Sequence, residues 1–436
     1  MPERRRRSMQ PRRHPDDADD TDDTGAARRR RLAAAVLVAL GCAFAVVVVT
    51  ARGSTGPTGR LGGDYPAFYT AGELVLDGRF DELYELDAQA AVQADLQGGE
   101  QGFLAFAYPP HVALLYTPLA ALPYRAAYAV HTLAMVAACV GALWLLRPRI
   151  ALLDREFPVV VAGALTSLPL FVALGLGQNT ALTLLLGALV WRGLTDRRPV
   201  LAGIAAGLMW YRPQYGIPLT GLLLVGRQTA AVVWAGGVVA VSWLIGVAWG
   251  GWGWVGTWLD AVSRFVELDG SANAHNAVTP YGAVEALTAP ASTAALATWA
   301  VAGGAAAAVL VLVWRRRVGT GKGADVDLAM AIALAGLLVV SNHSLYYDLG
   351  LLVPGVCLVA DRGLAGPHLM GGRLLAGAWL LALTHLTAPA LGVDPLALAP
   401  LALVALLAST ALRRSASIAT GATLPGTPSL VSGAPR

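Results

Sequence analysis

The sequence predicts an all-α polytopic membrane protein, a bundle of about twelve transmembrane helices. Hydrophobic residues make up 56% of the 436 residues and charged residues only 14%, whereas soluble domains carry about 25% charged residues. The mean hydropathy of +0.57 points the same way, and the apolar residues are gathered in long runs. The net charge of +4 carries little information, because the arginines are clustered and act locally.

The N-terminal stretch, residues 1–31, alternates basic and acidic blocks without an apolar pattern, so we expect a disordered cytoplasmic N-terminus. The basic block 28–31 directly precedes the first apolar run, 32–51. This position favours a topological anchor on the cytoplasmic side over a nucleic-acid contact. No cleavage site of small residues follows the run, so we expect a retained span.

Further apolar runs of spanning or near-spanning length follow, since about 17 to 25 residues cross a bilayer. The runs cover residues 126–146, 157–176, 180–194, 200–210, 214–225, 229–249, 291–314, 326–340, 345–359, 374–391 and 396–412.

Basic clusters follow alternate runs, and placing the N-terminus inside puts all of them on the cytoplasmic side. Two long loops, 53–108 and 250–290, are then extracytoplasmic. Residues 32–412 would form one transmembrane domain, and a Gly- and Pro-rich, disordered cytoplasmic tail would follow at 413–436.

Asp64 stands at the start of the first long loop, directly after the first span. A carboxylate where a hydrophobic bundle meets water can act as a base between a lipid-borne and a polar reactant. Tyr65, Phe68 and Tyr69 recur at near-helical spacing, which indicates a short amphipathic helix in the membrane interface, with its aromatics at headgroup depth. Because Asp64 begins this helix, an N-cap is the alternative role.

The loop ends in Tyr108-Pro109-Pro110-His111, and Pro118 and Pro123 interrupt or end the apolar segment that follows. Prolines at these places predict a short helix that re-enters the membrane without crossing it.

Polar residues also interrupt the later spans. Arg212 breaks an apolar hairpin, and an arginine there is costly unless it is paired or lines a cavity. A structural ion pair is the alternative. Gln178 and Asn179 lie at an outer turn, where they would bind sugar hydroxyls or cap a helix.

A second polar cluster, Asn-His-Ser-Leu-Tyr-Tyr-Asp at 342–348, lies at the outer mouth of two spans. His343 and Tyr347 are one helical turn apart, with Asp348 adjacent, and such residues at membrane depth favour function over packing. In the second long loop, Arg264 indicates either an interfacial helix or a phosphate ligand, and His275 lies in a polar stretch. We interpret His131, His368 and His385 as lone structural histidines.

The motifs that occur in order are Asp64-Tyr65, Phe68-Tyr69-Thr70-Ala71, Leu76-Asp77-Gly78, Leu83-Tyr84, Tyr108-Pro109-Pro110, Pro118-Leu119-Ala120-Ala121-Leu122-Pro123, Gly177-Gln178-Asn179, Arg212-Pro213-Gln214 and His343 through Asp348. This set, from about residue 61 to 348, resembles glycosyltransferase family 87, the polyprenyl-phosphate-mannose-dependent α-mannosyltransferases of the GT-C superfamily. One departure is Arg212, where the family more often has lysine before Pro-Gln, so a planar fork replaces a point charge.

The resemblance implies a multi-pass enzyme of the cell membrane that acts on its extracytoplasmic face. It would move a hexose, mannose in the family, from a polyprenyl-phosphate sugar donor to a lipid-linked glycoside or glycan acceptor. Asp64 matches the family's general base. Phosphate is a good leaving group, so cations that receive it suffice, and one base with direct displacement gives inversion at the anomeric carbon.

Besides the catalytic Asp64, we expect substrate contacts from Tyr65, Tyr69, Tyr108, Gln178, Asn179, Arg212, Gln214, Arg264, His275, His343, Tyr347 and Asp348. No Asp-x-Asp motif or histidine cluster indicates a metal, and nothing indicates a cofactor or a nucleic-acid partner. An arabinosyl- or glucosyltransferase of the same architecture stays open. A transporter of lipid or glycan would show an internal repeat with paired broken helices, which we do not find.

Overall fold

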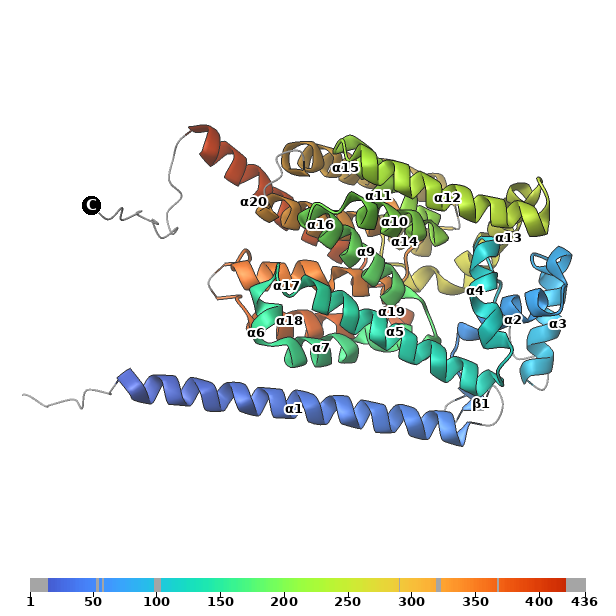
Figure 1. Cartoon of the computed structure of the whole chain (residues 1–436), viewed down its shortest axis with the longest axis horizontal. Coiled ribbons are helices and arrows are strands. Elements are labelled where there is room, and N and C mark those ends of the chain that lie inside the picture. Colours follow the sequence, from blue (N-terminus) through green and yellow to red (C-terminus); the bar gives the residue numbers. More distant parts are fainter. Residues whose placement is uncertain are drawn as a thin grey trace, which may run out of the picture.

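The computed structural model describes residues 15–51, 55–56, 59–97, 103–289, 291–318, 323–366 and 368–420. It is a bundle of helices (Figure 1), which confirms the predicted all-α polytopic membrane fold. Within the described residues, 5 helices are long and apolar enough to cross a membrane. They are α1 (Pro15–Thr50), α5 (Tyr124–Leu146), α12 (Thr229–Gly250), α15 (Thr293–Arg317) and the segment Gly372–Leu391. The bent pair α7 (Phe157–Thr166) and α8 (Leu168–Leu176), with 64° between its halves, would make a sixth.

The remaining predicted spans fold as helices at least as long as the sequence indicated, but they do not meet this length and hydropathy criterion. They are α9 (Thr180–Thr195), α10 (Pro199–Leu208) with η2 (Met209–Tyr211), α11 (Pro213–Val225), α16 (Gly323–Val340), η5 (Tyr346–Leu352) with α17 (Val353–Arg362), and α20 (Ala399–Thr420). A helix the length of α11 measures about 20 Å, against roughly 30 Å for the hydrocarbon core of a bilayer. Such short helices are accommodated where protein surrounds them: α16, for example, is buried along its described length.

The first and last helices are longer than predicted. The helix α1 begins at Pro15, inside the stretch for which we expected no ordered structure, and α20 continues to Thr420. Extending an existing helix costs far less than starting one. The side chain of Arg29 also pairs with Glu156 at 2.6 Å, and Arg30 donates to the carbonyl of Arg155. Our expectations for 1–14 and 421–436 lie outside the described residues.

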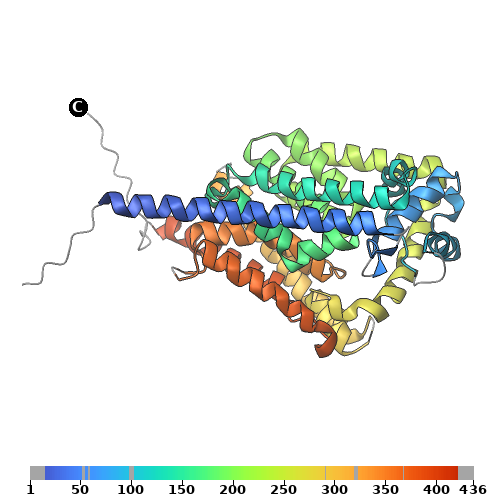
Figure 2. The same cartoon turned by 90° about the horizontal axis from the view of Figure 1, so that it is seen from below.

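The two ends of the bundle differ in character. The start of α1 and the end of α20 lie at one end in Figure 1, while α2 (Tyr65–Leu76), α3 (Leu86–Gln97) and α13 (Trp254–Asn273) form a lobe at the other. Figure 2 shows α1 running along one face of the bundle toward that lobe. The described ends of the chain and the two long loops therefore occupy opposite ends of the molecule.

The first long loop carries a two-residue antiparallel pair, β1 (Thr55–Gly56) and β2 (Gly59–Arg60), then α2, η1 (Phe80–Glu82) and α3. The prediction that the aromatic side chains of α2 face the lipid headgroups is wrong. Its aromatic side chains are buried in protein, and Phe68 stacks on Tyr116 of α4 (Pro110–Ala120) at 4.8 Å between ring centroids. A Cβ on Gly72 would lie 2.7 Å from the Tyr116 carbonyl, so glycine allows α2 and α4 to touch.

The second long loop folds as α13, η3 (Ala274–Asn276) and α14 (Pro280–Leu287). Its middle is fixed to the segment before η5, because the amide of Val278 donates to the Ser344 carbonyl at 3.0 Å and Ala277 bridges Leu345. The short helices α6 (Ala151–Arg155), α18 (Gly372–Ala382), η6 (Leu383–Thr387) and α19 (Ala388–Leu391) complete the bundle. The loops thus close over the end of the bundle where η5 begins.

Candidate active site

Asp64 is held against the end of α8 by the chain on both sides of it. Its amide donates to the carbonyl of Leu176 at 2.9 Å. The two preceding glycines make this approach possible: a Cβ on Gly62, whose φ is +68°, would lie 2.6 Å from the ring of Tyr128, and a Cβ on Gly63 would lie 2.5 Å from Leu176. The sequence Gly-Gly-Asp therefore brings a carboxylate onto the bundle.

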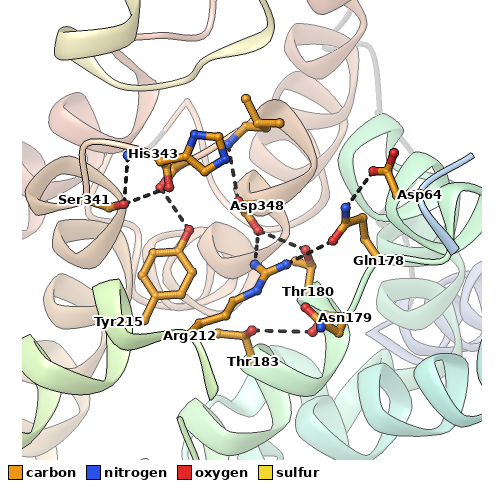
Figure 3. A network of polar contacts seen from close by, with 12 residues as sticks. Asp64, Gln178, Asn179, Thr180, Thr183, Arg212, Tyr215, Ser341, His343 and Asp348 are labelled. Atoms are coloured by element: carbon orange, nitrogen blue, oxygen red, sulfur yellow. Dashed lines mark hydrogen bonds and ion pairs between the residues drawn. The ribbon is translucent and has the colours of Figure 1, made fainter. Parts of the chain in front are cut away.

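The side chain of Asp64 does not cap α2. Asp64 occupies the N-cap position, with φ −98° and ψ −11°, but its side chain makes no capping hydrogen bond. Its Oδ2 instead accepts from Nε2 of Gln178 at 2.6 Å (Figure 3). The carboxylate is thus turned toward the later spans and away from its own helix.

Gln178 links Asp64 to a buried cation. The helix α8 ends at Gly177, whose φ of 73° is left-handed, and α9 begins at Thr180, so Gln178 lies in a break between helices. Its Nε2 donates to Asp64, and its Oε1 accepts from Nη2 of Arg212 at 3.1 Å. An amide has one donor and one acceptor end, so it can join an anion to a cation.

Arg212 lies at a second break, between η2 and α11, where Pro213 prevents continuous helix. It is 3% exposed, and its Nη1 donates to Oδ1 of Asp348 at 2.6 Å. Its Nη2 also reaches the hydroxyl of Tyr108 at 3.3 Å. Its buried Nε finds no hydrogen-bond partner among the described residues. A buried donor without a partner costs about 1–3 kcal/mol, so this guanidinium is poised for one more acceptor.

Asp348 is the counter-ion of Arg212 and is itself fixed. Thr180 donates to its Oδ1 at 3.0 Å, and the amide of Leu345 donates to its Oδ2 at 3.3 Å. The pair is nearly dry, with side chains 4% and 6% exposed. Such a pair is held by its hydrogen bonds as much as by its charges, because desolvation offsets much of the Coulomb attraction.

Tyr108 is positioned by the first long loop. Two glutamines of α3 hold the chain that leads to it: Gln89 accepts from the amide of Phe106 at 2.7 Å, and Gln93 bonds both the amide and the carbonyl of Leu104. The hydroxyl of Tyr84 then donates to the Tyr108 carbonyl at 2.8 Å. Burial raises the pKa of the Tyr84 phenol, so it remains a donor.

The structure therefore connects Asp64, Gln178, Arg212, Asp348 and Tyr108, and places the other predicted residues elsewhere. Tyr65 is fully buried among aromatic rings, and Tyr69 donates to the carbonyls of Ala120 and Leu122, so both lie in the core of the loop lobe. Tyr347 is buried beside Ala173 and Ala277.

The remaining predicted residues surround the network. Asn179 accepts from the hydroxyl of Tyr211 through its carbonyl at 3.0 Å, and Gln214 is half-buried in the first turn of α11. His343 is half-buried, with its ring edge-on to Phe265 at 5.8 Å. Arg264 is exposed and donates to the Tyr84 carbonyl, and His275 lies in η3.

Sequence reasoning missed two features. Thr180, next to the Gln178-Asn179 motif, holds Asp348, and its adjacency to that motif was the available signal. His385, interpreted as a lone residue, in fact pairs with Asp394 at 2.7 Å and stacks on Tyr346 at 3.7 Å between centroids. Asp394 lies after a turn, so the apolar pattern of the span that contains His385 does not indicate that the two side chains meet. Among the described residues, no group of three or more His, Cys, Asp or Glu could hold a metal ion.

Comparison with known proteins gives one match. No curated protein and no solved structure matches the chain significantly. The sequence model of glycosyltransferase family 87 matches residues 106–342, which include Tyr108, Gln178 and Arg212 but end before Asp348 and begin after Asp64. Because the match covers more than half of the 436 residues, the chain belongs to glycosyltransferase family 87.

Proposed function

We propose that this membrane glycosyltransferase transfers mannose from a polyprenyl phosphosugar to a lipid-linked glycoside or glycan, with inversion at the anomeric carbon. The observation that carries the proposal is the chain Asp64–Gln178–Arg212, in which one amide side chain separates a carboxylate from a buried cation. These are the two charges that the reaction needs: a base for the acceptor hydroxyl and a cation for the leaving phosphate.

The base in this proposal is Asp64. Its carboxylate is half-buried at the start of α2, and its hydrogen bond from Gln178 fixes where it points. The attacking hydroxyl becomes acidic as its bond to the anomeric carbon forms, and a carboxylate within hydrogen-bond reach then takes the proton. Gln178 has a second consequence: by holding Asp64 and Arg212 together it fixes their spacing, and small misplacements of catalytic groups cost about 10²-fold in rate.

The phosphate ligands in this proposal are Arg212 and Tyr108. Asp348 holds Nη1 of Arg212 and Gln178 accepts from Nη2, so Nε is the donor left for an anion, and a charge-assisted hydrogen bond from it suits a phosphate oxygen. The hydroxyl of Tyr108 lies beside Nη2 as a further donor. Because Asp348 already balances part of the charge, the released polyprenyl phosphate can also leave.

We place this site on the extracytoplasmic side, with both termini in the cytoplasm. The support is the distribution of arginines, which gather at the ends of α5, α9, α15 and α17 away from the loop lobe. The hairpin of α10 and α11 enters from that basic end and carries Arg212 at its tip, roughly 20 Å along.

Purified protein in lipid, supplied with a panel of radiolabelled polyprenyl-phosphate sugars and a lipid glycoside acceptor, tests the proposal. We expect transfer from the mannosyl donor above the arabinosyl and glucosyl donors, and a product whose anomeric configuration is opposite to that of the donor. Transfer with retention would exclude a single-base displacement. Preference for another sugar would change the donor and leave the site intact, and failure with every polyprenyl donor would reject the proposal.

A further inference from the structure

A second candidate site begins one residue along the chain from Asp348, the counter-ion of Arg212. An apolar groove of about 690 Å³ runs between the bent pair α7–α8, the segment η5–α17 and the helix α18, and its far wall is completed by α20. Its lining is almost wholly aliphatic, apart from Ser167 and Trp379. The mechanism proposed above makes no use of this groove.

The groove lies beside a break in one helix and a change of helix type in another. At Ser167, with ψ 137°, α7 stops, and α8 restarts at 64° to it. Opposite this break, the 3₁₀ segment η5 gives way to α17 at Val353. Ser167, Leu349 and Val353 all line the groove, so one end of it, which we call the upper end, lies where the break at Ser167 faces this change of helix type. Broken backbone at membrane depth is tolerated where it lines a cavity.

The upper end of the groove adjoins the polar site. Leu349, which lines the groove, directly follows Asp348, the counter-ion of Arg212. From there the groove follows α7 from Ser167 to Val159, a length of roughly 12 Å along the helix. The helix α18 forms the outer wall: none of its residues is fully buried, and the indole of Trp379 donates to the hydroxyl of Thr166 of α7 at 3.3 Å.

We propose that this groove holds the first isoprene units of the donor's polyprenyl chain, an inference that rests on the proposed function. In a polyprenyl phosphosugar the chain is bonded directly to the phosphate, so it must leave the site from the phosphate position. The groove begins one residue from the ion pair that we assign to that phosphate. The acceptor, by contrast, reaches the site at Asp64, beyond Gln178. The almost wholly aliphatic lining suits a hydrocarbon chain better than a sugar.

Two glycines allow the groove to be filled without disturbing its walls. Gly163 of α7 and Gly372 of α18 both line the groove, and a Cβ at either would meet no atom within 4 Å. A matched control lies on α18 as well: a Cβ on Gly377 also meets nothing within 4 Å, but Gly377 does not line the groove. Gly163→Phe should block the middle of the groove, Gly372→Phe its far end, and Gly377→Phe neither.

The test measures how well each variant uses a long polyprenyl donor relative to a donor with one isoprene unit, which ends before Gly163. We expect wild type to prefer the long donor by more than about tenfold, since two buried methylene groups already correspond to roughly that factor. Gly163→Phe should abolish the preference, Gly372→Phe should reduce it, and Gly377→Phe should keep it. The ratio within one preparation does not depend on the fraction of folded protein.

The outcomes separate this inference from the proposed function. If wild type uses neither donor, the proposed function fails. If wild type transfers the sugar and Gly163→Phe keeps the full preference, the groove does not hold the donor chain. A higher acceptor KM with unchanged donor use would assign the groove to the acceptor's lipid, and would also overturn the inference. A polyprenyl phosphate with a photoreactive group in its first isoprene units provides a second measurement: it should label peptides from α7 or α17 in wild type, and label them less in Gly163→Phe.

Discussion

Two buried arginine–aspartate centres stand near opposite ends of α16, and they are built differently. Near its start, the carboxylate of Asp327 accepts two bonds from Arg149 at 2.9 Å, one from Arg362 at 3.1 Å and one from the indole of Trp191 at 2.8 Å. Beyond its other end, Asp348 meets a single arginine, Arg212.

In the function we propose, this difference separates a centre that stabilises the fold from one that receives a ligand. At Asp327, two cations and an indole occupy the carboxylate, and the result ties the ends of α5, α9, α16 and α17 together. At Asp348, the partner arginine, Arg212, keeps a buried Nε without a hydrogen-bond partner among the described residues. Its Nη2 is linked to Asp64 by hydrogen bonds through Gln178. Two cations and an indole hold the Asp327 carboxylate, whereas Arg212 keeps a donor that gains from binding an acceptor.

The largest expected effect is on catalysis at Asp64. Asp64→Asn keeps the size of the side chain and can still accept from Gln178, but an amide cannot take the acceptor's proton. We expect turnover to fall by about 10²- to 10⁴-fold with donor binding retained. Asp64→Glu should also be slow, by about 10²-fold, because one methylene displaces the carboxylate. Single-turnover assays beside donor-binding measurements check this. Substantial turnover in the Asn variant would move the search for the base to His343 or Asp348.

Arg212 offers the next contrast. Arg212→Ala should nearly abolish donor use and also leave Asp348 buried without its cation, at a cost of about 3–5 kcal/mol in the free energy of unfolding. Arg212→Lys keeps the charge and loses the fork, so part of the donor affinity should remain. Donor KM and kcat per folded molecule distinguish the two effects. Wild-type donor kinetics in folded Arg212→Ala protein would place the phosphate elsewhere.

Matched substitutions at the two centres test the comparison directly. Asp327→Asn should lower the free energy of unfolding by about 3–5 kcal/mol, because two arginines lose their counter-charge. Turnover per folded molecule should stay near that of wild type. Asp348→Asn, the same chemical change at the other centre, should lower turnover as well, because Arg212 is no longer held in place. Equal turnover in both variants would remove the distinction between the centres.

The smallest effect is expected from single cysteines that report on which side of the membrane each end of the bundle lies. Asp87, exposed on α3, and Arg198, exposed in the turn between α9 and α10, lie at opposite ends of the bundle. A cysteine at Asp87 should react with an impermeant thiol reagent in intact cells, and one at Arg198 should react only after lysis. Both variants keep activity, since neither residue is in the network. The reverse pattern would put Asp64 on the cytoplasmic face.

The sequence predicted those parts of the fold and site that follow from the solvation of single residues. Apolar runs located the helices, and the cost of a bare charge marked Arg212 and Asp348 before their pairing was seen. The wrong predictions concern which elements pack against one another. Tyr65 and Phe68 have the spacing of an interfacial helix, yet α4 covers them. The periodicity of a helix does not say whether lipid or protein faces it. Pairings such as His385 with Asp394 likewise depend on a turn that no pattern encodes.

The attachment of Asp64 to the bundle also bears on how the polypeptide could be divided. The helix α1 that precedes it is peripheral, with 6% of its apolar window buried. Asp64 is instead anchored by contacts of its own segment: its amide on Leu176, and the hydroxyl of Tyr124 on the carbonyl of Leu61 at 2.7 Å. Two fragments separated between α1 and Leu61 would therefore each keep their internal contacts. The chain lends itself to assembly from two co-expressed pieces, with the first helix supplied in trans.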